Sequence, residues 1–181
     1  MSNRLRTWAG ALLAGVLILP FVSARAGTVN EVSEFGANPG HLRMFRYRPD
    51  AVSVPAPLVV ALHGCQQSAA DYARQAGWAQ QADRWGFVLL LPEQQKANNG
   101  QRCFNWFRPE STGRDQGEAG SIRRMIAQMQ ADNPIDPRRI FVAGLSAGGA
   151  MTAVLLADYP ELFAGGATVA GVPYGCASGL T

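Results

Sequence analysis

Histidine is scarce in this sequence, and several other features are missing from it. Only His41 and His63 are present, which limits any chemistry that needs a histidine base. The spacing of the three cysteines matches no zinc-binding pattern, and we expect neither a metal ion nor an organic cofactor. No basic stripe with interleaved aromatic residues occurs, so a nucleic-acid partner is not indicated. Internal repeats are also absent, which excludes a repeat architecture.

The apolar run near the N-terminus is short for a membrane span. Residues 8–22 are apolar but contain a proline, follow a segment with two arginines, and precede Ala24-Arg25-Ala26. This order of a basic region, an apolar region and a small-residue cleavage site is typical of a secretory signal peptide. We therefore predict that residues 1–26 direct secretion and are removed, in preference to an uncleaved anchor. No other stretch is long enough to span a bilayer.

Removal of this leader leaves a nearly neutral chain. The formal net charge of +3 arises from 16 Lys+Arg against 13 Asp+Glu. Three of the arginines lie in the predicted leader, which contains no acidic residue. The mature chain therefore shows no charge that would attract nucleic acid or a membrane surface. Residues 27–181 suffice for one packed domain.

Short apolar runs alternate with helical patterns along the mature chain. Two strands are predicted near residues 29–35 and 41–48, and buried strands over 58–62, 87–91, 140–143 and 166–170. Helices are predicted over 68–85 and 117–131 and from 147 to about 158. Pro92 is expected to end a strand, and Asp136-Pro137 to form a turn. This alternation predicts an α/β protein with a mostly parallel sheet that binds ligands at the carboxyl ends of its strands.

The strand at 140–143 leads directly into Gly144-Leu145-Ser146-Ala147-Gly148 and then into a helical pattern. A G-x-S-x-G sequence between a strand and a helix is typical of a nucleophilic serine. The sharp turn should hold Ser146 in a strained backbone conformation and require glycine on either side. The N-terminus of the following helix would favour negative charge developing at this serine. An ordinary strand-to-helix turn is the simpler alternative, but the flanking elements favour the nucleophile.

A serine nucleophile also requires an oxyanion hole, a base and an orienting acid. The backbone N–H of Ala147, directly after the serine, is the first expected oxyanion donor. The second donor is expected in the loop after an earlier strand, and His63-Gly64-Cys65 occupies such a loop. We assign this role to the Cys65 N–H. Gly64 would allow a tight approach and His63 could point into the site, so both are candidates for substrate binding.

The base and the acid have no candidates in the expected order. They should follow the serine, as an acid and then a histidine, whereas both histidines precede Ser146. The acidic residues after it, Asp158 and Glu161, are expected to be solvated or capping groups near a helix end. We therefore expect residues 27–181 to be the N-terminal part of a longer catalytic domain whose sheet is incomplete here. A pseudoenzyme is the alternative, although it would have no reason to keep so complete a serine motif.

The long predicted loop over residues 93–116 carries Cys103-Phe104-Asn105-Trp106-Phe107. Loops of this length in compact domains are usually functional or disordered, and this one is too aromatic for simple disorder. Trp106 is our candidate for an apolar wall of the substrate site. Phe104 and Phe107 fit a core position and a substrate wall equally well.

The three cysteines of an exported protein are expected to form disulfides. Because Cys65 and Cys103 both lie in loops at the carboxyl end of the sheet, we predict a disulfide between them that pins the aromatic loop beside the serine. Cys176 would then pair beyond the end of this sequence. Three buried free thiols are the alternative.

Five segments of the mature chain occur in a recognisable order: Leu62-His-Gly-Cys-Gln66, Cys103-Phe-Asn-Trp-Phe107, Gly144-Leu-Ser-Ala-Gly-Gly-Ala-Met151, Tyr159-Pro160 and Ala170-Gly-Val-Pro-Tyr-Gly175. Together they resemble secreted esterases of the poly(3-hydroxybutyrate) depolymerase family, which are related to feruloyl and acetylxylan esterases. The resemblance implies an α/β-hydrolase fold and hydrolysis of carboxylic esters through an acyl-enzyme on Ser146. The family's Asp and His have no counterpart in these residues.

We therefore predict a secreted serine esterase of the polyhydroxyalkanoate depolymerase type. A feruloyl or acetylxylan esterase acting on plant-wall esters is an alternative among enzymes. A non-catalytic module that binds polymer through Trp106, or an inactive fragment, is the alternative from another class. An Asp and then a His at later strand ends would favour the enzyme.

Overall fold

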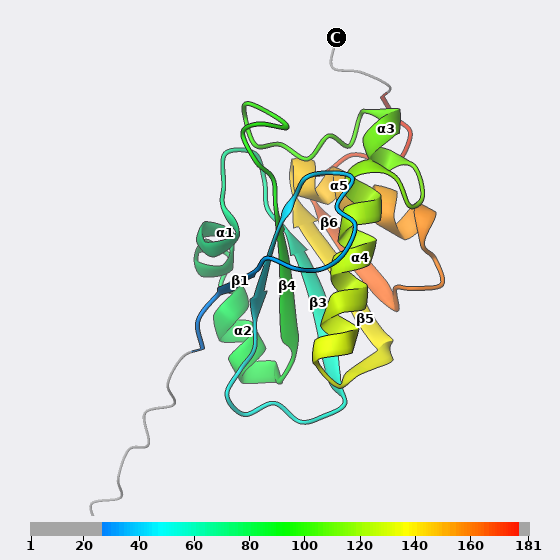
Figure 1. The fold of residues 1–181 in the computed structure, drawn as a ribbon. Coiled ribbons are helices and arrows are strands. Elements are labelled where there is room, and N and C mark those ends of the chain that lie inside the picture. Colours follow the sequence, from blue (N-terminus) through cyan, green and yellow to red (C-terminus); the bar gives the residue numbers. More distant parts are fainter. Residues whose placement is uncertain (1–26, 178–181) are drawn as a thin grey trace, which may run out of the picture.

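Six strands form one sheet in the computed structural model, which describes residues 27–177. In sheet order they are β1 (Asn30–Val32), β2 (Arg43–Tyr47), β4 (Val88–Glu93), β3 (Ala56–Leu62), β5 (Ile135–Leu145) and β6 (Gly165–Val169). The last four in this order run parallel to one another, whereas β1 and β2 pair in antiparallel fashion (Figure 1). The predicted mostly parallel sheet is confirmed. The predicted leader, residues 1–26, lies outside the described residues.

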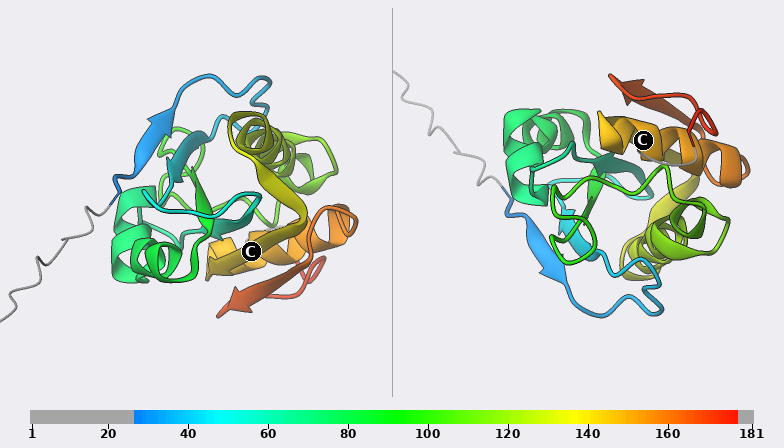
Figure 2. Two further views of the ribbon diagram at one scale, coloured as in Figure 1. Left: turned by 90° about the horizontal axis from the view of Figure 1, so that it is seen from below. Right: turned by 90° about the horizontal axis from the view of Figure 1, so that it is seen from above.

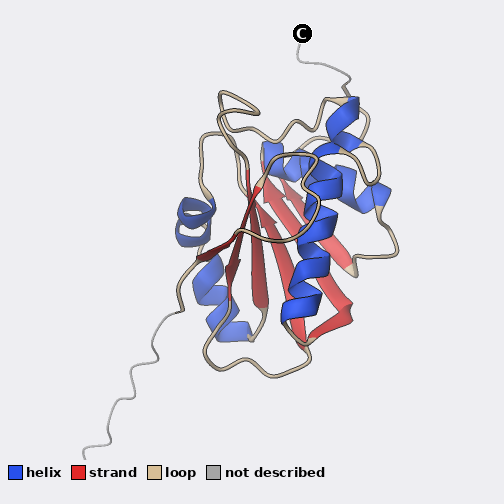
Figure 3. Ribbon diagram, viewed as in Figure 1, coloured by secondary structure: helices blue, strands red, loops and turns tan. Residues whose placement is uncertain are grey.

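Helices cover both faces of the sheet (Figure 3). They are α1 (Ala69–Gln75), α2 (Trp78–Trp85), α3 (Pro109–Thr112), α4 (Gly117–Asp132) and α5 (Ala147–Asp158). α4 and α5 share one apolar cluster with Leu58 and Val60 of β3. α1 and α2 share another with Ala61 of the same strand, because successive side chains of a strand point to opposite faces. β3 is therefore buried on both faces, as its continuous apolar run predicted.

The structure differs from the sequence-based prediction at three places, each of which contains a glycine or a proline. The helix predicted over 68–85 is two helices, because Gly77 adopts a left-handed φ of 69° between α1 and α2. β4 continues past Pro92 to Glu93, where the missing proline N–H affects only the last part of the strand. The turn predicted at Asp136-Pro137 lies within β5, whose pairing with β3 shifts register there.

The two edges of the sheet are β1 and β6, which lie on opposite sides of the molecule (Figure 2). Four of the five residues of β6 are exposed. No helix within residues 27–177 is long and apolar enough to cross a membrane.

Candidate active site

Ser146 lies at the sharp turn between β5 and α5. Its backbone has φ 55° and ψ −119°, a strained conformation for a residue with a side chain. A Cβ on Gly144 would lie 2.2 Å from the Gly148 carbonyl oxygen, and one on Gly148 would lie 2.2 Å from the Leu62 carbonyl oxygen. Both positions therefore require glycine, which confirms the predicted backbone strain and its cause. The Ser146 N–H donates to the Val169 carbonyl at 2.8 Å and fixes the turn against β6.

The loop after β3 lies directly beside this serine. A Cβ on Gly64 would lie 3.6 Å from the Ser146 Cβ, so the backbone of the loop approaches the side chain that it would serve. Neither the Cys65 N–H nor the Ala147 N–H donates a hydrogen bond to any residue that the structure describes. Both residues line the pocket next to Ser146. Two such amides beside an exposed serine remain the candidates for oxyanion donors.

A pocket of about 180 Å³ opens beside Ser146. Its wall includes Cys65, Cys103, Trp106, Phe107, Ala150, Ala170 and Val172. Trp106 is half-buried and packs edge-to-face on Phe107, with ring centroids 5.5 Å apart. Phe104 is instead fully buried and belongs to the core under α4 and α5. Trp106 thus lies where an apolar wall was expected, and the two phenylalanines divide between the pocket and the core.

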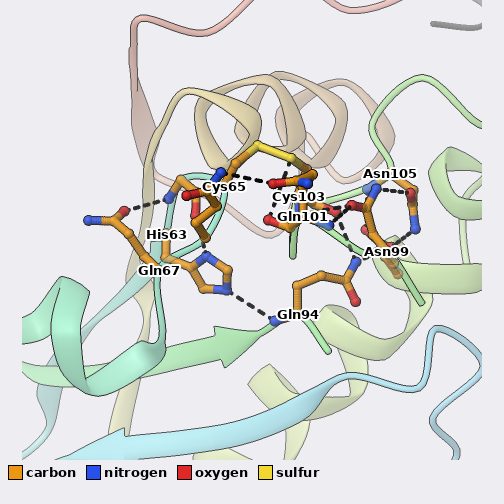
Figure 4. The surroundings of a disulfide bond; sticks show 11 residues. His63, Cys65, Gln67, Gln94, Asn99, Gln101, Cys103 and Asn105 are labelled. Atoms are coloured by element: carbon orange, nitrogen blue, oxygen red, sulfur yellow. Dashed lines mark hydrogen bonds between the residues drawn. A yellow bond between two sulfur atoms is a disulfide. The ribbon is translucent and has the colours of Figure 1, made fainter. Parts of the chain in front are cut away.

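Cys65 and Cys103 form a disulfide, as predicted. It joins the loop after β3 to the loop after β4 (Figure 4). Beside it, the Gln66 N–H donates to the Gln101 carbonyl at 2.7 Å, and the Gln66 side-chain amide donates to Gln101 Oε1 at 2.8 Å. Cys176 is exposed and has no disulfide partner within residues 27–177. The two loops that frame the pocket are therefore held together by one covalent bond and by hydrogen bonds on either side of it.

His63 is buried and does not line the pocket, in contrast to the expected substrate contact. Its Nδ1 lies 2.7 Å from the Gly64 carbonyl, and its Nε2 lies 3.0 Å from the Gln94 N–H (Figure 4). Because a carbonyl only accepts, Nδ1 carries the proton and Nε2 accepts from Gln94. Burial lowers the pKa of His63, which agrees with an Nε2 that accepts a hydrogen bond. With both nitrogens engaged, the imidazole fixes the loop and is not free to act as a base.

Glu118 is a site residue that the sequence-based prediction missed. This carboxyl in the first turn of α4 is 1% exposed. It accepts from the Asn105 N–H at 2.8 Å, from Asn105 Nδ2 at 2.6 Å and from Gln94 Nε2 at 2.6 Å. Burial outweighs these donors and raises the pKa of Glu118 to about 7. A buried polar chain thus runs from His63 through Gln94 to Glu118 and Asn105 beneath the aromatic loop. In the sequence, the only indication of this buried polar chain is the presence of polar residues near the ends of the loop.

The remaining candidates for a base or an acid do not face the serine. His41 is exposed just before β2, and β2 lies three places from β5 in the sheet, or about 14 Å at the usual strand spacing. Glu161 forms an exposed ion pair with Arg114. The backbone carbonyl of Asp158 also accepts from Arg114, and burial raises the pKa of its carboxyl. No cluster of His, Cys, Asp and Glu in the described part of the chain is arranged to hold a metal ion.

Comparison with known proteins gives consistent matches. A family model described as "Esterase PHB depolymerase" matches residues 43–180. The chain is 48% identical over 170 residues to the poly(3-hydroxyalkanoate) depolymerase C of Paucimonas lemoignei, a match that covers 94% of this chain and 41% of that protein. It is 35% identical to the feruloyl esterase B of Thermothelomyces thermophilus, over 85% of this chain and 52% of that protein.

Solved structures agree with these matches. An acetyl xylan esterase from Aspergillus awamori superposes with a TM-score of 0.77 at 30% identity, over 83% of this chain and 54% of that chain. The fold is the α/β-hydrolase fold. The chain spans about half the length of the curated relatives that it matches.

Proposed function

Because the chain belongs to the esterase PHB depolymerase family, we propose that it carries the nucleophile and the oxyanion hole of a secreted serine esterase. The observation that carries this proposal is the pair of unpaired amides, those of Cys65 and Ala147, beside the strained and exposed Ser146. In the proposed site, Ser146 would attack a carbonyl carbon whose oxygen faces the two donors.

In the proposed reaction, Ser146 Oγ attacks the ester carbonyl and its proton passes to a base. The carbonyl oxygen becomes an oxyanion that accepts hydrogen bonds from the Cys65 and Ala147 N–H groups, and the N-terminus of α5 favours its charge. The alcohol then leaves with the proton, and water hydrolyses the acyl-enzyme on Ser146. Each oxyanion donor is expected to contribute roughly 3 kcal/mol to transition-state stabilisation.

The base and the orienting acid are proposed to lie outside the described residues. Both ring nitrogens of His63 are engaged, and His41 lies just before β2, three strands away from β5. In the curated relatives about half of the length is outside the match. A complete enzyme would carry its histidine and carboxylate in that part.

The substrate is proposed to be an ester of an aliphatic hydroxyalkanoate. The pocket beside Ser146 is small, with a volume of about 180 Å³, and Trp106, Phe107 and Val172 give it an apolar wall. The 48% identical relative is a poly(3-hydroxyalkanoate) depolymerase. Relatives at 34–35% identity are feruloyl and acetylxylan esterases, so methyl ferulate and acetylated xylan are the comparison substrates.

The experiment is hydrolysis of p-nitrophenyl butyrate and of a 3-hydroxybutyrate oligomer by the full-length secreted protein. Ser146→Ala should lower the rate by at least about 10³-fold, and Ser53→Ala, an exposed serine between β2 and β3, should leave it unchanged. Activity retained by Ser146→Ala would refute the nucleophile assignment. The isolated 181-residue chain should show no rapid burst of acylation, and a burst would contradict the proposed location of the base.

A further inference from the structure

A second hollow is lined by residues that neighbour the Cys65–Cys103 disulfide in the chain. It has a volume of about 420 Å³ and is lined by Gln66, Lys96, Gly100, Gln101 and Arg102. An adjoining hollow of about 280 Å³ shares Lys96 and Arg102 with it. These two cations therefore stand at the junction of both hollows, and we call this region the cationic hollow.

No acidic side chain in the described residues pairs with the two cations of the cationic hollow. Glu93 borders it, but its carboxylate pairs with Arg43 at 2.9 Å and accepts from the Ala69 N–H at 2.7 Å. Lys96 and Arg102 form no ion pair with any residue that the structure describes. Two positive side chains thus remain available to a ligand.

The loop that carries these cations is held in place. The Arg102 N–H donates to the Asn99 carbonyl at 2.7 Å, and the Gln101 N–H donates to Asn99 Oδ1 at 3.0 Å. The Asn99 side-chain amide donates in turn to Asn105 Oδ1 at 3.0 Å (Figure 4). The backbone of Arg102 has a positive φ of 51°, and these hydrogen bonds hold the turn in which it lies. A fixed backbone lowers the entropy cost of binding.

The cationic hollow is directly next to the pocket of Ser146. Cys65 and Cys103 line that pocket, and their chain neighbours Gln66 and Arg102 line the hollow. Neighbouring Cα atoms lie about 3.8 Å apart. One extended ligand could therefore place a carbonyl at Ser146 and a second group at Arg102.

We propose that Lys96 and Arg102 bind the terminal carboxylate of a hydroxy-acid oligomer whose scissile ester lies at Ser146. This proposal rests on the proposed esterase function and specifies its leaving group. In such an oligomer the alcohol portion released by cleavage is the portion that ends in a carboxylate. Arginine binds carboxylates through paired N–H donors. The site would therefore favour esters near the acid end of a chain over esters in its middle.

The test measures binding to the Ser146→Ala protein, so that the ligand is not consumed. The two ligands are the trimer of 3-hydroxybutyrate as the free acid and the same trimer as its methyl ester. The binding of each is measured by calorimetry or by ligand-observed NMR. Exposed ion pairs are individually weak, so the free acid should bind about 5- to 10-fold more tightly than the methyl ester. Adding Lys96→Gln and Arg102→Gln should abolish this preference. Arg124→Gln, which removes an exposed cation on α4, should preserve it.

Equal binding of acid and methyl ester, no binding of either, or a preference that survives the double substitution would overturn the proposal. Free 3-hydroxybutyrate that competes as strongly as the trimer acid would show a site for a released acid, and would overturn the assignment to a chain end. Failure of the esterase function is detected separately, as the absence of Ser146-dependent hydrolysis of neutral p-nitrophenyl butyrate.

Discussion

Replacement of Glu118 by glutamine should remove a pH dependence of stability that burial of this carboxyl creates. The side chain is 1% exposed and accepts three hydrogen bonds, from the Asn105 N–H, Asn105 Nδ2 and Gln94 Nε2. A glutamine can keep its carbonyl oxygen facing the two side-chain donors. Its NH₂ group would then face the Asn105 N–H, and one buried donor would lose its partner.

The size and sign of the effect follow from the pKa of Glu118. Burial raises this pKa from 4.5 to about 7 in the folded protein, a difference worth about 3 kcal/mol. Below about pH 4.5 both states hold the proton and no penalty exists. As the pH rises towards 7 the unfolded chain loses its proton first, so the free energy of unfolding decreases. Arg108 is the charged side chain that opposes this effect.

The assay is urea unfolding of the wild type and Glu118→Gln at several pH values between 5 and 8. At pH 5 the variant should be less stable by about 1–3 kcal/mol, the cost of one unsatisfied buried donor. Over this range the stability of the wild type relative to the variant should fall by about 2.5 kcal/mol. His63, whose pKa burial lowers from 6.5, contributes the opposite slope in both proteins and cancels. A stability difference that does not change with pH would refute the assignment of this titration to Glu118.

Two further substitutions test the backbone and the disulfide of the site. Gly148→Ala places a Cβ 2.2 Å from the Leu62 carbonyl and should cost at least about 3 kcal/mol in chemical denaturation, because backbone atoms must move. Gly165→Ala is the control, because its Cβ would meet only a Phe141 side-chain atom at 4.0 Å. It should change the free energy of unfolding by less than about 0.5 kcal/mol. Equal losses in both variants would contradict the steric argument. A double alanine substitution at Cys65 and Cys103, which are 38 residues apart, removes the disulfide. It should lower the free energy of unfolding by about 4 kcal/mol. A loss below about 1 kcal/mol would show that the loops are fixed without the disulfide.

The main elements of the fold were predictable because each depends on a local pattern. The apolar runs gave the central strands, and the spacing of Ile122, Met125 and Met129 gave α4. The errors lie at glycine and proline, whose effect depends on tertiary context. Gly77 divides a helix that the apolar pattern would continue, and Pro92 is tolerated because it lies near the end of β4.

The candidate site was predictable to the extent that it is built from short motifs. The backbone of Ser146 and its flanking glycines follow from five consecutive residues. The roles of His63 and Glu118 were not predictable in this way. Each is set by contacts with residues more than ten positions away in the sequence, and a buried polar side chain has no periodic signal.

The aromatic loop and the serine turn are separate parts of the chain that are held by different contacts. The disulfide and the polar contacts beneath the loop hold it to the loop after β3 and to α4, whereas the Ser146 N–H donates to Val169. The side chains of Trp106 and Phe107 can therefore be exchanged without altering the backbone contacts that hold Ser146. Under the proposed function, such an arrangement would allow a lineage to change its preferred ester while it keeps Ser146 in place. Laboratory evolution towards a new ester can accordingly be confined to a few loop positions, with the glycines around Ser146 left untouched.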